Sequence, residues 1–249
     1  MFSPRVAAAS LSGRSDAEWA RSATPFVGAA FLGGLALDEP TRRAARTLVE
    51  RDREEFLPAD PFDWIDRQLV ALDDEPLTAG VNVRAASPPP IARAAAICAR
   101  HGALLEINAH CRQQSMCAAG AGQPLLSDPN RLATYVRSAV DQGATVSVKL
   151  RTEVDTVDLQ AVATACDRAG ADVLHLDAMD SEPVVRAVAE ATDAFVIANN
   201  EVRDRASVRE YLEYGADAVS VGRPSTEPVV LERVRDATTE WFDAERPRA

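Results

Sequence analysis

The chain has 249 residues, 47% of them hydrophobic and 26% charged, and a formal net charge of −11 at pH 7; this length suits one large domain, because α/β barrels commonly fill it without dividing. A sequence pI near 4.8 argues against a broad basic surface for nucleic acid, and no DNA partner is expected, although a local basic funnel stays compatible with it. No stretch reaches the roughly eighteen apolar residues of a membrane span, and the N-terminus lacks a basic region followed by an apolar core, so we expect a cytoplasmic protein.

The first part of the chain has the less regular pattern. Two apolar runs, residues 4–10 and 25–37, can form strands. The acidic stretch 38–74 is predicted to be helical, and it makes an irregular insertion over residues 37–76 between the second and the third strand. No linker-like composition marks a second domain, so residues 1–249 are predicted to form a single one.

From residue 77 onward, short apolar runs alternate with helical stretches. Strands are predicted at 77–83, 104–108, 144–150, 171–176, 194–199 and 216–222. Helices are predicted at 88–102, 129–142, 159–169, 183–191, 207–214 and 228–242; a triple proline opens the first, Gly102 ends it, and Asp128 can cap the second. These six units and the two earlier strands predict a closed (β/α)8 barrel, the TIM-barrel fold, rather than an open sheet.

Polar residues and glycine stand at the ends of nearly all these strands. Enzymes with this fold place their chemistry at the C-terminal ends of the strands. The residues found there are Asn82, Asn108, Lys149, His175, Asn199, Asn200, Gly222 and Arg223. Any one of them could be an ordinary strand end, but their joint occurrence predicts a functional site at this end of the barrel.

Lys149 is the only lysine among 27 basic residues, and all the others are arginine. An ammonium is a compact point charge, whereas a guanidinium is a planar fork, so a site that fits one need not fit the other. Lys149 lies in an apolar run, and an inward-facing charge on a buried strand is costly unless an anion meets it. We therefore expect Lys149 to face an anion.

The acidic, arginine-rich composition also fits a halophile-like protein, since screening is short-ranged at high salt.

The last two strand ends indicate which kind of anion to expect. Loops after the seventh and eighth strands of such barrels often bind phosphate together with the N-terminus of a short helix. Residues 196–202 and 219–225 fit this pattern, because Gly222 permits close approach of the backbone and Arg223 can hold phosphate through its fork. The same Gly-Arg-Pro sequence would also serve as an ordinary turn.

The segment 107–126 holds two of the four cysteines. Cys111 lies three residues beyond a strand end, beside His110 and an arginine, in a loop whose positive charge could tune a thiol for proton donation. Cys117 is a rival candidate, whereas Cys98 and Cys166 lie on apolar helix faces and are expected to be structural. The chain has no C-x-x-C pair, so neither a zinc site nor a disulfide framework is indicated, and no metal is expected.

Several of these segments together resemble the tRNA-dihydrouridine synthase family of FMN-dependent barrels. The resemblance is carried by NAHCRQQ and GAGQPLL around Cys111, and then by VSVKLR, LHLDAM, VIANN and DAVSVGR. It covers about residues 10–225, is strong from residue 104 onward, and is closest to the short archaeal branch with the signature N-A-H-C-R-Q. The segment SLSGRSDAEW is similar to the family's N-terminal A-G-x-T-D motif, with Gly13, Ser15 and Asp16 in step.

The resemblance implies a role in cofactor binding for most of the strand ends. Lys149 matches the lysine that faces the pyrimidine ring of FMN, and His175 matches the histidine at the flavin and phosphate side. Asn82 stands where the family commonly has glutamine. The phosphate-binding loops are matched by Asn199, Asn200, Gly222 and Arg223.

The resemblance also implies the catalytic residues. Asn108 and Cys111 match the asparagine and the general-acid cysteine of the family's N-x-G-C-P loop, in which His110 and Arg112 here replace glycine and proline. The implied reaction reduces the C5–C6 double bond of a uridine in tRNA. Flavin delivers a hydride to C6, Cys111 protonates C5, Lys149 stabilises the reduced flavin, and NADPH or NADH reloads the cofactor.

Two other functions stay open at this point. Only about 25 residues follow Arg223, fewer than the C-terminal helical domain with which long members of the family grip tRNA, and the net charge of −11 gives little general attraction for RNA. A flavin-dependent reductase or dehydrogenase of a free pyrimidine or a dihydroorotate-like acid is therefore one alternative. The other is a non-catalytic barrel that binds a phosphorylated ligand. The sequence leaves the oligomeric state open.

Overall fold

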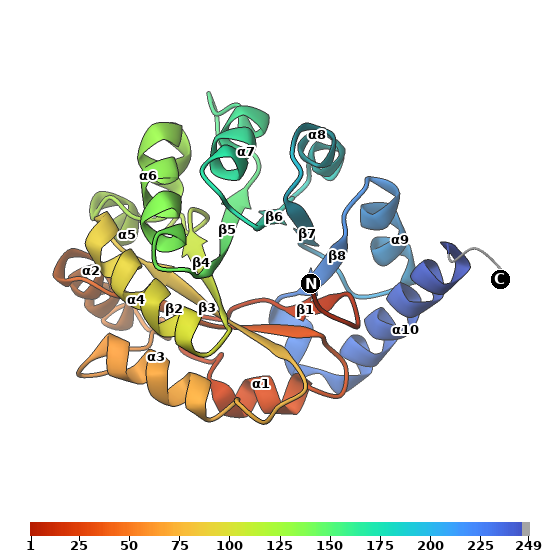
Figure 1. Ribbon diagram of the computed structural model, residues 1–249, viewed down its shortest axis with the longest axis horizontal. Helices are drawn as coiled ribbons and strands as arrows, with labels where there is room; N and C mark the ends of the chain where they lie inside the picture. The colour runs from red at the N-terminus through yellow and green to blue at the C-terminus, as the bar shows by residue number, and fades with distance from the viewer. Residues whose placement is uncertain (246–249) are drawn as a thin grey trace.

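The computed structural model describes residues 1–245, which form a closed barrel of parallel strands (Figure 1). The strands are β1 (Val6–Ala8), β2 (Ala29–Ala36), β3 (Thr78–Arg84), β4 (Leu104–Asn108), β5 (Thr145–Arg151), β6 (Val173–Asp177), β7 (Phe195–Asn199) and β8 (Ala218–Val221). Each strand pairs with the next one along the chain, and β8 closes the ring on β1. The predicted (β/α)8 barrel is confirmed.

Helices form an outer ring around the strands (Figure 1). They are α1 (Ala17–Ala23), α2 (Glu39–Val49), α3 (Pro61–Val70), α4 (Pro88–Arg100), α5 (Gln114–Ala118), α6 (Pro129–Val140), α7 (Leu159–Arg168), α8 (Val184–Ala191), α9 (Arg205–Glu213) and α10 (Pro228–Glu245), with the short 3-10 helices η1 (Gln123–Ser127) and η2 (Arg223–Thr226). Six helices are capped by an aspartate that accepts backbone N–H groups of the first turn: Asp16, Asp38, Asp60, Asp128, Asp158 and Asp204. Because a carboxylate there also complements the helix dipole, part of the chain's acidity stabilises the ring.

The segment between β2 and β3 is helical only in part. The helices α2 and α3 take up most of it, but residues 51–60 form a loop. This loop packs closely on Gly13, where φ is +75° and an added Cβ would lie 2.6 Å from the carbonyl carbon of Glu54. The contact holds the loop at the C-terminal end of the barrel, where Arg53 and Glu55 line a cavity.

The barrel interior changes from apolar to polar along its axis. Inward-facing apolar side chains fill the end at which the strands begin: Phe2, Ala7, Ala29, Phe31, Leu104, Val173, Ile197 and Ala218. Two residues further along, side chains of the same strand faces are polar, as at Glu106, His175 and Ser220, which are all fully buried. A larger apolar cluster lies between the strands and the helices. The chain therefore has its main core outside the barrel and a polar layer within it.

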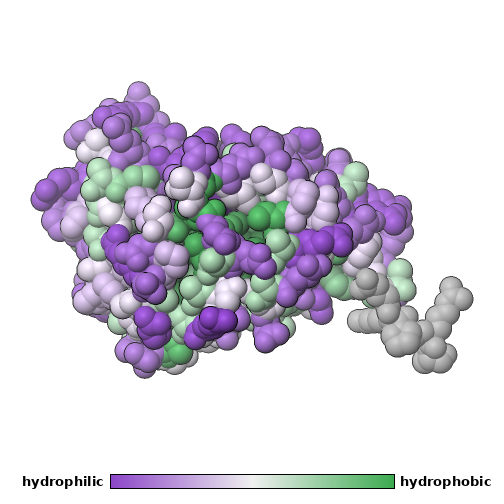
Figure 2. Space-filling view, turned by 90° about the horizontal axis from the view of Figure 1, so that it is seen from above, coloured by the Kyte–Doolittle hydropathy of each residue, from purple (hydrophilic) through white to green (hydrophobic). Residues whose placement is uncertain are grey.

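The outer surface seen in Figure 2 is mostly hydrophilic. This agrees with a composition in which 26% of the residues are charged. Within residues 1–245, no helix combines the length and the apolar character that a membrane crossing requires.

Candidate active site

A cavity of about 650 Å³ opens at the C-terminal end of the barrel. Its volume lies within the roughly 300–1,000 Å³ that is typical of small-molecule sites. Nine of the ten site residues predicted from the sequence line it: Asn82, Asn108, His110, Cys111, Lys149, Asn199, Asn200, Gly222 and Arg223. The tenth, His175, does not.

Cationic side chains outnumber carboxylates in the cavity wall. The cations are Arg53, Arg84, Arg112, Lys149, Arg151, Arg203 and Arg223, and the carboxylates are Glu55, Asp177 and Glu201. Seven cations against three carboxylates make a local basic funnel in a protein whose net charge is −11. Such a wall favours an anionic ligand.

Glu106 is the centre of the polar layer beneath the cavity, and the sequence analysis missed it. Its carboxylate accepts hydrogen bonds from Asn82 Nδ2 at 2.7 Å, Ser147 Oγ at 3.0 Å and His175 Nδ1 at 2.7 Å. Burial alone would raise the pKa of Glu106, but His175, the charge of Lys149 and the Asn82 hydrogen bond together lower it to about 2. The sequence did contain a signal for this role, since Glu106 is a lone carboxylate inside the apolar run LLEIN. A buried charge needs partners, so this carboxylate could have been predicted to bind other polar side chains.

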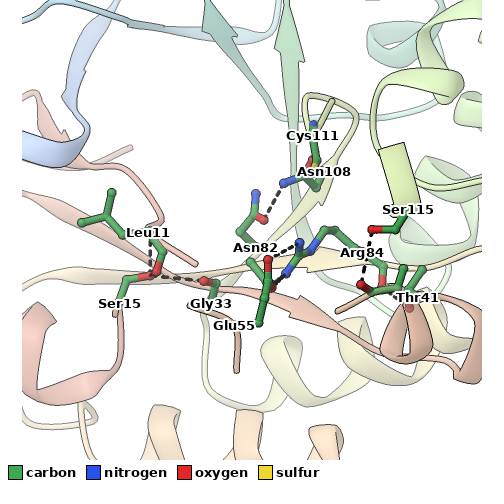
Figure 3. A network of polar contacts seen from close by, with 12 residues as sticks. Leu11, Ser15, Gly33, Thr41, Glu55, Asn82, Arg84, Asn108, Cys111 and Ser115 are labelled. Atoms are coloured by element: carbon green, nitrogen blue, oxygen red, sulfur yellow. Dashed lines mark hydrogen bonds and ion pairs between the residues drawn. The ribbon is translucent and has the colours of Figure 1, made fainter. Parts of the chain in front are cut away.

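Two asparagines transmit this fixed geometry to the loop after β4. Asn82 Oδ1 accepts a hydrogen bond from Asn108 Nδ2 at 2.9 Å (Figure 3). Asn108 Oδ1 accepts the backbone N–H groups of His110 at 3.1 Å and Cys111 at 2.9 Å. Both amide oxygens are therefore occupied by the protein. What each side chain can still offer a ligand is one N–H donor.

His175 lies one layer deeper than the strand-end position expected for it. The predicted strand ended at residue 176, whereas β6 continues to Asp177, so Asp177 occupies the cavity wall and His175 is fully buried below it. His175 Nε2 lies 2.7 Å from Ser220 Oγ, which donates to Asn199 Oδ1 at 2.9 Å. His175 thus links Glu106 to the cavity residue Asn199, and the structure does not bring its imidazole to the cavity.

Lys149 faces the cavity between β4 and β6. It is 4% exposed, and it is in register with Asn108 on one side and His175 on the other. Its charge lowers the pKa of both Glu106 and Asp177. Within residues 1–245, however, no group accepts a hydrogen bond from its ammonium, so all three donors are available to a ligand.

A hydrogen bond crosses the cavity wall between His110 and Asp177. His110 Nε2 is hydrogen-bonded to Asp177 Oδ2, while Asp177 Oδ1 is buried without a hydrogen-bond partner among the described residues. Burial, together with the charges of Lys149 and Arg151, lowers the pKa of His110 against the opposing effect of Asp177. Burial would raise the pKa of Asp177, but the hydrogen bond from His110 and nearby positive charges lower it. The pair therefore ties the loop after β4 to the end of β6.

Cys111 is the thiol that reaches the cavity. Its carbonyl accepts the N–H of Gln123 at 2.9 Å, and an added Cβ at Gly122, where φ is +74°, would lie 2.4 Å from that carbonyl oxygen. Cys117 does not line the cavity; its thiol lies 3.5 Å from the carbonyl oxygen of Cys111, and burial raises its pKa. Cys98 and Cys166 are fully buried, and burial raises the pKa of each to about 12, as a structural role requires.

The ends of β7 and β8 form an open, strained edge of the cavity. At Gly222 an added Cβ would meet only Asn199 Oδ1, at 4.0 Å. Glycine therefore leaves space at this edge of the cavity. Asn200 and Met179 have φ of 108° and 50°, and Asn200 Nδ2 donates to the carbonyl of Met179 at 3.1 Å. Such conformations cost about 1–3 kcal/mol each and cluster at ligand sites.

Ser225, in η2, adds a further polar group near this edge. Its hydroxyl oxygen is buried without a hydrogen-bond partner among residues 1–245.

Within the described residues 1–245, no group of histidine, cysteine and carboxylate side chains could hold a metal ion.

The fold and the cavity define a (β/α)8 barrel protein with a cavity rich in cationic side chains at the C-terminal ends of its strands. The chain belongs to the dihydrouridine synthase (Dus) family, whose model matches residues 65–248, more than half of its length. An uncharacterized protein of Methanocaldococcus jannaschii is 26% identical over 232 residues, which cover 88% of each chain.

The synthases among the relatives match a smaller share of their own length. tRNA-dihydrouridine synthase B of Serratia marcescens is 30% identical over 189 residues, which cover 68% of this chain and 56% of the relative. For the Xanthomonas axonopodis synthase B the identity is 27% over 220 residues, with 81% and 66% covered. The match thus spans less than two thirds of the length of these enzymes.

Solved structures show the same fold at low sequence identity. Morphinone reductase in complex with tetrahydroNAD superposes with a TM-score of 0.64 at 14% identity, over 94% of this chain and 87% of that one. Thiamine phosphate pyrophosphorylase from Pyrococcus furiosus gives a TM-score of 0.57 at 12% identity, over 95% and 96%. At these identities the likeness concerns the fold alone.

Proposed function

We propose that the protein is a flavin-dependent reductase that forms dihydrouridine in tRNA, with FMN bound in the cavity. The observation that carries the proposal is Lys149, an ammonium 4% exposed that faces an open cavity without an acceptor among the described residues. A buried cation without a bonded partner requires an anionic or electron-rich ligand. Membership of the dihydrouridine synthase family supports flavin as that ligand.

The wall residues fit FMN. The remaining N–H donors of Asn82 and Asn108 and the ammonium of Lys149 can meet the electronegative edge of a flavin ring. Gly222 leaves room for a phosphate, which Arg223 can bind through its fork. When bound, the flavin supplies the hydride that adds to C6 of uracil, and NADPH or NADH is the proposed source of its electrons.

Cys111 is the proposed proton donor. Its S–H bond breaks as a C–H bond forms at C5 of the uracil ring, and the thiolate remains in the cavity. Asn108 fixes the backbone N–H of Cys111 and so the direction in which the thiol points. Lys149 stabilises the negative charge that reduction places on the pyrimidine edge of the cofactor. His110 is the other proton donor within the same loop, and Asp177 holds its ring.

The proposed substrate is uridine within tRNA, because the synthase relatives are named for it. Four arginines of the cavity wall are exposed and can contact phosphates beside an extruded base: Arg53, Arg112, Arg203 and Arg223. The net charge of −11 gives no general attraction for RNA, so a small pyrimidine, which the same cavity could hold, is the alternative substrate. A non-catalytic barrel that binds a phosphorylated ligand is the third reading.

Two measurements separate these readings. Purified protein mixed with FMN should acquire the visible absorbance of a bound flavin, and Lys149→Met should bind it at least about tenfold more weakly. A colourless protein that ignores FMN would favour the non-catalytic barrel. Mass spectrometry of tRNA nucleosides, with and without the gene, should show loss of dihydrouridine. An unchanged dihydrouridine content, with flavin bound, would point to the small pyrimidine.

A further inference from the structure

A buried ion pair lies in the cavity wall on the side of the thiol. Arg84, the last residue of β3, pairs with Glu55 from the 51–60 loop, and the two side chains are 2% and 3% exposed. Arg84 Nη1 donates to Glu55 Oε1 at 3.2 Å, and Nη2 donates to Glu55 Oε2 (Figure 3). Nη2 also donates to the carbonyl of Gly34. Desolvating two charges is costly, so a buried pair is weak evidence for a stabilising role. Because the pair lines the same cavity as the Cys111 thiol, it is in a position to act in the proposed chemistry.

β2 is shaped to receive this arginine. The register between β2 and β3 shifts between Gly33 and Leu35, and φ is +88° at Gly33 and +71° at Gly34. Such a bulge re-aims the backbone, here so that the carbonyl of Gly34 accepts from Arg84. The Nε of Arg84 nevertheless stays buried without a hydrogen-bond partner among the described residues. The protein therefore holds the guanidinium firmly without using all of its donors.

Cys111 lies on the same side of the cavity. It packs against a small apolar cluster that includes Ala36. Leu57 of the 51–60 loop packs against the same cluster. Ala36 is in register with Arg84. Burial lowers the pKa of Arg84, whereas Glu55 and, with a smaller effect, the sulfur of Cys111 raise it above its usual value. Arg84 and Cys111 therefore line the same side of the cavity, with Ala36 beside both of them.

We propose that Arg84 is a positioning residue that, oriented by Glu55, stabilises the thiolate which Cys111 leaves when it gives up its proton. The inference rests on the proposed function and deepens it. As a hydride adds to C6, the electron pair of the C5–C6 double bond takes the thiol proton at C5, and the electrons of the S–H bond stay on sulfur. A guanidinium is always protonated, so the new anion meets a fixed cation.

Glu55 has two opposite effects on the thiolate. It holds the arginine fork in place, and its negative charge offsets part of the guanidinium's field at the sulfur. Removing only that charge should therefore favour the thiolate, whereas removing both charges should disfavour it. The other charged groups of the cavity wall remain the same in every variant below: Arg53, His110, Arg112, Lys149, Arg151, Asp177, Glu201, Arg203 and Arg223.

The test measures how fast iodoacetamide alkylates Cys111, by peptide mass spectrometry, in a Cys117→Ser background that removes the rival thiol. At neutral pH we expect Glu55→Gln to raise the rate several-fold, up to about tenfold, and Arg84→Gln combined with Glu55→Gln to lower it by a similar factor. The double variant leaves no uncompensated buried charge, whereas Glu55→Gln alone leaves that of Arg84, so circular dichroism must first show that each variant is folded. Arg14→Gln is the matched control, because it breaks the exposed ion pair with Glu54 on the same loop.

Rates at high pH, where every thiol is ionised, report accessibility together with the lower nucleophilicity of a more stabilised thiolate, so they should differ by less than about threefold among the four proteins. Opposite changes at neutral pH, with rates that differ this little at high pH, support the role of Arg84. The role of Arg84 would be overturned if the alkylation rate changed in the same direction in Glu55→Gln and in the double variant. It would also be overturned if the rates of the four proteins differed as much at high pH as at neutral pH. Dihydrouridine formation does not enter this measurement, so failure of the proposed function would leave the alkylation result intact.

Discussion

Replacing Glu106 with glutamine removes the buried anion that accepts hydrogen bonds from Asn82, Ser147 and His175. The pKa of Glu106 is lowered from 4.5 to about 2. This difference in pKa corresponds to about 3 kcal/mol of folding free energy, since a tenfold change in proton affinity is worth about 1.4 kcal/mol. Because the pKa of the folded state is depressed, this stability is present above pH 4.5 and is lost as the pH falls toward 2. At about pH 3, roughly 2 kcal/mol of it should be gone.

Urea unfolding followed by circular dichroism, at several pH values, measures the effect directly. The difference in unfolding free energy between wild type and Glu106→Gln should be largest near neutral pH and should shrink by about 2 kcal/mol at about pH 3. Glu190→Gln, at an exposed position of α8, is the control and should change the unfolding free energy by less than about 0.5 kcal/mol throughout. A Glu106→Gln effect that is constant over this range would refute the assignment of an ionised carboxylate at the centre of the barrel.

Three further predictions concern the proposed chemistry. Lys149→Arg keeps the charge but changes its shape, so we expect FMN reduction by NADPH or NADH to slow at least about tenfold in stopped-flow measurements; unchanged kinetics would mean that the solitary lysine has no special role. Cys111→Ala should leave FMN bound and lower dihydrouridine formation at least about a hundredfold, with Cys117→Ala as the control; full activity would move the proton donor to another residue. Gly222→Val fills the space beside Asn199, so fluorescence titration should show FMN affinity reduced by about tenfold or more, and an equal affinity would place the cofactor elsewhere.

The residues that the sequence analysis missed follow a simple rule of strand geometry. Side chains two positions apart on a strand share a face, and the missed cavity residues Arg84, Arg151 and Asp177 each lie two residues after a predicted one. The ends of these three strands were predicted one residue too early, because charged residues close an apolar run even where the strand continues. Glu55 could not have been found in this way, since its place depends on how a loop folds back onto β3.

Local patterns were enough to predict the eight strands, the order of the helices after residue 77 and nine of the residues that line the cavity, because the period of apolar residues and the aspartate caps are local properties. The depth of each side chain within the barrel depends on the tertiary structure. His175 is buried beneath the cavity, Asp177 lies in the cavity wall although it is only 8% exposed, and Arg84 is joined to Glu55. These outcomes depend on strand register and on contacts between distant segments, which no local pattern encodes.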